Sequence, residues 1–168
     1  MPRVIIVFIC WLLWTSAGAQ RATISHSVAC VGNAGDIEHA ADYARAVSEL
    51  LDTVGHNQTI LFTGDLVQSG EAFSQRFSKI DTLVASLYRH SRRKLVFIPG
   101  DRDWDNSGPD GWEDVRQLEE YVKALNIDNV IWPLESGCPG PVRVDLDLTL
   151  NMIAINTQWW NHRHIKPT

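Results

Sequence analysis

Short apolar runs alternate along this chain with longer amphipathic segments, and few architectures accommodate that alternation. Three of the runs have the length and composition of buried strands: residues 27–31, 59–62 and 95–98. Apolar residues recur at helical spacing in the segments that follow them, at 36–51, 71–88 and about 112–125. Strands that alternate with helices over short connections predict an α/β domain with right-handed crossovers.

The last third of the chain is expected to add strands. Val130 to Trp132 has the pattern of a short strand. Residues 142–146 and 148–156 have the pattern of two more, and a turn near Asp147 would join them as a hairpin.

Composition indicates one globular domain without a basic surface. The chain has 168 residues, of which 45% are hydrophobic and 21% are charged. The formal net charge is −5, which argues against a nucleic-acid partner. The basic residues Arg92, Arg93 and Lys94 follow the second predicted helix, where they suit a solvated turn.

The first residues have the three parts of an export signal. Arg3 precedes an apolar run from Val4 to Trp14 that is too short to span a bilayer, and Ala17-Gly18-Ala19 offers a small-residue cleavage site. We therefore predict that residues 1–19 are a signal peptide, that residues 20–168 form the mature domain, and that the protein is periplasmic or extracellular. The alternative is a buried N-terminal strand or helix.

Polar residues follow each of the first three predicted strands. The clusters lie at 32–36, 63–65 and 99–104. Because the carboxyl ends of neighbouring strands meet at one edge of such a sheet, Asp65, Asp101 and Asp103 are expected to converge there. Gathered carboxylates need cations, and their oxygens suit Mg, Mn or Ca, or iron and zinc where imidazoles join them. In the alternative interpretation each Asp only ends a strand or caps a helix, as Asp36 is expected to do.

The three clusters resemble, in order and spacing, the first three motifs of the calcineurin-like metallophosphoesterases, a family that includes the purple acid phosphatases. Those motifs have the forms G-D-x-G, G-D-x-x and G-N-H-D or G-N-H-E, each at a strand end. The stretch 97–104, Phe-Ile-Pro-Gly-Asp-Arg-Asp-Trp, is the most specific match. The resemblance covers nearly the whole mature chain. It implies a layered metallophosphoesterase-like sheet with flanking helices, of which this chain is the N-terminal portion, with the second half of the fold missing.

The resemblance also implies a two-metal site for hydrolysis of a phosphorylated small molecule or another phosphoester, with Mn, Fe or Zn as cofactors. Asn33, Asp65 and Asp101 match its metal-ligand positions. Arg102 matches the catalytic histidine, and Asp103 matches the acid that orients that histidine. Asn33 replaces the family's Asp and offers only a neutral oxygen. Arg102 is always protonated, so it can clamp a phosphate but is a poor general acid, and Asp103 is expected to pair with its charge.

Three hypotheses follow. The first is an exported, metal-dependent phosphoester hydrolase represented by its N-terminal portion, which alone would be inactive because the family's later histidines are missing; the pair His162-x-His164 is not counted as a replacement. The second is a catalytically impaired pseudoenzyme that acts as a binding or scaffold module in the cell envelope, to which a missing C-terminal region would attach it. The third is an unrelated α/β domain whose Gly-Asp turns are only turns.

Overall fold

The structure is a computed structural model that describes residues 23–167, apart from 55, 68–76 and 89–91. The predicted signal peptide lies outside the described residues. A parallel sheet forms the centre of the fold, from β1 (His26–Val31), β2 (Asn57–Phe62), β3 (Arg93–Phe97) and β4 (Val130–Ile131), in the order β1-β2-β3-β4. Within the described residues, no helix is both long and apolar enough to cross a membrane.

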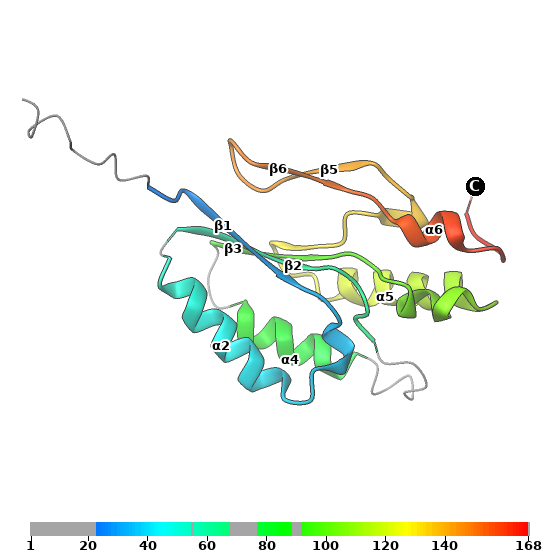
Figure 1. The fold of residues 1–168 in the computed structure, drawn as a ribbon, viewed down its shortest axis with the longest axis horizontal. Helices are drawn as coiled ribbons and strands as arrows, with labels where there is room; N and C mark the ends of the chain where they lie inside the picture. Colours follow the sequence, from blue (N-terminus) through cyan, green and yellow to red (C-terminus); the bar gives the residue numbers. More distant parts are fainter. Residues whose placement is uncertain (1–22, 55, 68–76, 89–91, 168) are drawn as a thin grey trace, which may run out of the picture.

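Three helices cover one face of this sheet (Figure 1). They are α2 (Ala40–Asp52), α4 (Ser78–Leu87) and α5 (Gly111–Ala124). Their apolar stripes bury side chains against alternate strand residues, among them Ile60, Phe62, Leu95 and Phe97, all fully buried. The rings of Phe62 and Phe97 stack with centroids 4.6 Å apart. Each such side chain contributes about 2 kcal/mol through burial, so this layer supplies most of the hydrophobic stabilisation. The predicted α/β class is confirmed.

Helix α2 begins later than the sequence predicts, whereas helix α4 lies within its predicted range. Asp36 was expected to cap a helix, but it lies in a short 3-10 turn, η1 (Ala34–Asp36), and α2 begins only at Ala40 after His39. The prediction is wrong because the Asp36 carboxylate bonds Asn33 and Arg102 instead of free helix amides. The second predicted helix, 71–88, is present as α4, and residues 71–76 lie outside the described part.

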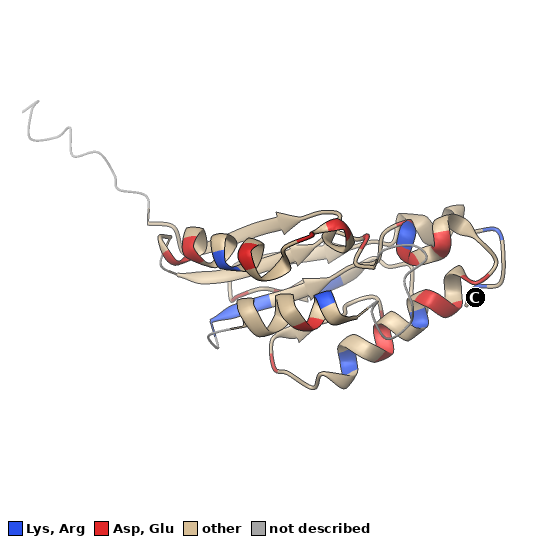
Figure 2. Ribbon diagram, turned by 90° about the horizontal axis from the view of Figure 1, so that it is seen from below, with Lys and Arg blue, Asp and Glu red and all other residues tan. Residues whose placement is uncertain are grey.

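Charged residues of both signs occur along the helices, as Figure 2 shows. On α5, Arg116 pairs with Glu113 and with Glu120, and Lys123 pairs with Glu119. Pairs at three- and four-residue spacing add a few tenths of a kcal/mol each to an exposed helix.

The predicted hairpin lies across the other face of the sheet (Figure 1). Strands β5 (Val142–Asp145) and β6 (Asn151–Ala154) pair antiparallel, so the expected turn near Asp147 is confirmed. Val144 and Leu146 pack on Val96 in a small second core. This second core does not extend over β1, where Val28 and Cys30 are exposed.

Asp147 both shapes the hairpin turn and ties it to the sheet. Its Oδ1 accepts hydrogen bonds from the backbone amides of Thr149 (2.7 Å) and Leu150 (2.9 Å). Its Oδ2 lies 2.7 Å from Nδ1 of His26 in β1, and Nε2 of His26 lies 2.9 Å from the hydroxyl of the fully buried Thr59. Hydrogen bonds, those from Thr149 foremost, lower the pKa of Asp147 to about 2.

Replacing Asp147 by alanine should loosen the hairpin while the parallel sheet stays folded. The variant loses the turn contacts and the link to His26 together, so we expect hairpin amides to exchange with solvent about tenfold faster. Hydrogen exchange measured by NMR would test this. Asp145→Ala is the matched control, because the Asp145 side chain is exposed and, among the described residues, bonds only Arg143 of the same strand. Equal exchange in both variants would contradict the prediction.

Candidate functional site

The loops that leave β2 and β3 touch each other at two glycines. A Cβ on Gly64 would lie 2.4 Å from the Cα of Gly100, and a Cβ on Gly100 would lie 2.6 Å from the amide nitrogen of Asp65. Gly64 also has a φ of +102°, which side chains rarely adopt. Glycine at both positions lets the loops approach, which brings Asp65 next to Asp101 and Arg102.

The loop after β1 joins the same edge. The backbone amide of Gly35 donates to the carbonyl oxygen of Asp65 at 2.6 Å, and the Lys79 ammonium of α4 donates to the carbonyl of Gly35. Asn33 and Asp65 both have left-handed backbone conformations, with φ of 56° and 53°. Asn and Asp tolerate this region better than most residues, so their place at these bends has a local structural reason.

Arg102, in the loop after β3, lies among side-chain oxygen atoms of the loops after β1 and β2. Its Nη1 donates to Oδ2 of Asp36 at 2.7 Å and to Oδ1 of Asn33 at 3.0 Å, and its Nε lies 3.7 Å from Oδ2 of Asp65. The Asn33 amide also donates to Asp36 at 2.8 Å. Sequence reasoning placed Asn33, Asp65, Asp101 and Arg102 at one edge but assigned Asp36 to a helix. The sequence could have indicated that Asp36 belongs to the site, because Asp36 lies in the same strand-end loop as Asn33.

The pKa values of Asp36 and Asp65, the two carboxylates that pair with Arg102, shift in opposite directions. Hydrogen bonding to the guanidinium lowers the pKa of the exposed Asp36. Partial burial raises the pKa of Asp65, the neighbouring Asp101 carboxyl adds to that increase, and the backbone amide of Arg102 opposes it. With all groups ionised, Asp36, Asp65 and Asp101 outnumber the cations Lys79 and Arg102. The edge is therefore slightly acidic although an arginine lies at its centre.

Asp103 was expected to pair with the charge of Arg102, and this prediction is wrong. Its side chain points into the protein, where Oδ1 accepts the backbone amides of Leu66 (2.8 Å) and Val67 (3.2 Å) and Oδ2 accepts that of Gly100 (2.7 Å). Burial raises the pKa of Asp103 to about 7, and the three amides oppose the increase. The Asp103 carboxylate thus braces the loop after β2 against the loop after β3, through hydrogen bonds made inside the protein.

The surroundings of Arg102 do not favour a two-metal centre in the part of the chain that the structure describes. Within that part, no three His, Cys, Asp or Glu side chains gather closely enough to hold a metal ion. The oxygens of Asn33 and Asp65 face the Arg102 guanidinium, and a fixed positive charge at that place repels a second cation. The donor set therefore does not fit two adjacent metal ions.

Of the pair His162-x-His164, His162 packs against the neighbouring loop, whereas His164 is exposed. Arg102 begins a 3-10 turn, η2 (Arg102–Ser107), on which the helix α6 (Thr157–Asn161) packs. His162 follows α6 and is buried, with its ring centroid 4.9 Å from that of the buried Trp104. Burial lowers the pKa of His162, so the neutral imidazole is favoured.

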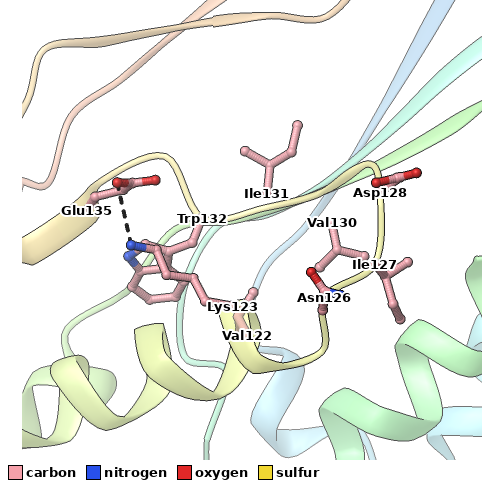
Figure 3. A pocket seen from close by; sticks show the side chains of 9 residues that line it. All are labelled: Val122, Lys123, Asn126, Ile127, Asp128, Val130, Ile131, Trp132 and Glu135. Carbon is pink, nitrogen blue, oxygen red and sulfur yellow. Dashed lines mark ion pairs between the residues drawn. The ribbon is translucent and has the colours of Figure 1, made fainter.

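A hollow lies beside the short edge strand β4, away from Arg102 (Figure 3). It encloses about 280 Å³ between the end of α5 and the chain that follows β4. Lys123 points across it to Glu135, 3.5 Å away, and also bonds Glu119. Because its lysine is already neutralised by carboxylates of this chain, the hollow offers no unpaired lysine to an anionic ligand.

Comparisons with known proteins identify no relative: no family model, no curated protein and no solved structure matches this chain.

Proposed function

We propose that this chain is a metallophosphoesterase-like module that binds the phosphoryl group of a small molecule and does not hydrolyse it. This proposal corresponds to the second hypothesis from the sequence, a catalytically impaired pseudoenzyme that is exported and works in the cell envelope. One observation carries the proposal: the Arg102 guanidinium lies at the centre of the strand-end site, in contact with Asn33, Asp36 and Asp65.

Arg102 retains hydrogen-bonding capacity toward solvent. Nη1 serves Asn33 and Asp36, whereas Nη2 has no hydrogen-bond partner among the described residues. The side chain is 35% exposed. The two N–H donors of Nη2 can bond phosphate oxygens, which arginine recognises with more geometric specificity than lysine does.

The arrangement of layers also supports the proposal. Helices lie on one face of the parallel sheet and an antiparallel hairpin on the other, which agrees with the general α/β class that the proposal requires. The site lies at the carboxyl ends of the strands, where ligands of open α/β sheets bind. The two loops braced by Asp103 would hold Arg102 in place before a ligand arrives.

Phosphate binding and metal content, measured on one preparation of the mature protein, test this function. We expect inorganic phosphate to bind in a calorimetric titration, and we expect Arg102→Ala to weaken the affinity by about tenfold or more. After equilibration with Mn, Fe or Zn, we expect less than one metal ion per chain and no hydrolysis of p-nitrophenyl phosphate.

The hydrolase hypothesis predicts the opposite result. Nearly two metal ions per chain, with hydrolysis that is lost in Asp65→Ala, would establish a working phosphoesterase and reject the proposal. Phosphate affinity that is equal in the wild type and in Arg102→Ala would also reject it, because the anion would then bind elsewhere.

A further inference from the structure

We propose that Asp36 is an autoinhibitory contact, which occupies Arg102 and lowers the affinity of the strand-end site for phosphate. This inference rests on the proposed function, since it concerns the same guanidinium. It assigns a role to a residue that the family resemblance leaves without one, and it predicts that removing a side chain near the site improves binding.

The geometry of Asp36 is that of a competitor. Its Oδ2 accepts from Nη1 of Arg102 at 2.7 Å, which is the kind of contact that a phosphate oxygen would make. Asn33 donates to the same Oδ2 at 2.8 Å and accepts from the same Nη1 at 3.0 Å, so three polar groups form one closed set. Both partners of the ion pair are partly exposed, at 35% for Arg102 and 37% for Asp36, so a ligand can reach them.

The charge of Asp36, like its position, disfavours phosphate binding at Arg102. A carboxylate this close to the guanidinium cancels most of its field and repels an incoming dianion. An exposed ion pair of this kind is only marginally stable, so a phosphate can displace it at a modest cost. The opposite role, in which Asp36 only orients Arg102 for the ligand, predicts weaker binding when Asp36 is changed. The sign of the effect therefore decides between the two roles.

The test compares phosphate titrations of the wild type, Asp36→Asn and Asp42→Asn at low ionic strength. Asparagine keeps the shape and a hydrogen-bond acceptor but removes the charge, and we expect roughly fivefold to tenfold tighter binding by Asp36→Asn. Asp42→Asn is the matched control, since Asp42 pairs with Arg45 at the same 2.7 Å and is exposed on α2. Its phosphate affinity should equal that of the wild type.

A second measurement follows the contact itself without a ligand. The side-chain N–H hydrogens of Arg102 should exchange with water several-fold faster in Asp36→Asn than in the wild type, as observed by NMR. Unchanged exchange, or phosphate affinity that is equal to or weaker than that of the wild type, would overturn the inference. If Arg102→Ala binds phosphate as well as the wild type does, the proposed function fails; if only the Asp36→Asn result fails, that function survives without autoinhibition.

Discussion

Asp103→Ala should lower the free energy of unfolding by about 3 kcal/mol, although the residue lies next to a solvent-exposed loop. The substitution leaves the amides of the buried Leu66 and Val67 and of the half-buried Gly100 without this acceptor. Each buried amide that loses its partner costs about 1–3 kcal/mol, and rearrangement of the loops recovers part of the sum. The two strand-end loops should then separate, so phosphate affinity is expected to fall together with stability.

Urea unfolding followed by circular dichroism would measure this effect. Asp103→Asn is the matched control, because its amide oxygen can still accept from one of the two loops, and we expect it to lose about half as much stability. A loss below about 1 kcal/mol for Asp103→Ala would mean that the three amides find other partners, and the bracing role would be rejected.

The contribution of the Asp103 carboxyl to folding stability should change with pH in a definite direction. Burial raises the pKa of Asp103 from 3.8 to about 7 in the folded protein, so the folded state holds this proton more tightly than the unfolded state does. The stability contributed by that proton is complete below about pH 4 and is lost as the pH rises to about 7. The stability advantage of the wild type over Asp103→Asn should therefore shrink across this window and become constant above it.

The strands and the edge at which the site lies could be predicted from the sequence because both depend on local patterns. Runs such as 59–62 and 95–98 are apolar apart from Thr59, which indicates burial on both faces. The polar residues that follow these runs are then expected at the strand ends. Asn33, Asp65 and Arg102 accordingly lie together. The turn at Asp147 was also predictable, because apolar runs flank it closely on both sides.

The pairing of the charges could not be predicted, because it depends on the directions of side chains across long separations. Asp36 and Arg102 lie 66 residues apart, and only the folded loops show that they meet. Asp103 follows Arg102 directly, yet the backbone turns its carboxylate beneath the loop while the guanidinium remains at the surface. The environment of Arg93 also could not be predicted from the local sequence. Because Arg93 lies in a basic cluster, it was predicted to be solvated, but it is only 2% exposed.

Arg93→Met should destabilise the protein by about 3 kcal/mol, an effect as large as that of any single change at the candidate site. The Arg93 guanidinium joins three elements at the amino end of the sheet, bonding Gln58 of β2 (2.8 Å), Ser48 of α2 (2.9 Å) and the Leu87 carbonyl that ends α4 (3.1 Å). Its remaining nitrogen bonds Asp52 at 3.0 Å. Methionine fills a similar volume but leaves these buried polar groups without their donor.

The neighbouring arginine provides the control for this prediction. Arg92 is exposed and lies one position earlier in the same chain segment, so Arg92→Met removes an equal charge without removing a buried donor. Its midpoint of urea unfolding should stay close to that of the wild type, whereas Arg93→Met should unfold at a clearly lower concentration. Because Arg93 lies at the opposite end of β3 from Arg102, the phosphate affinity of the folded variant should not change. Equal midpoints for the two variants would show that Arg93 is as dispensable as its solvated neighbour.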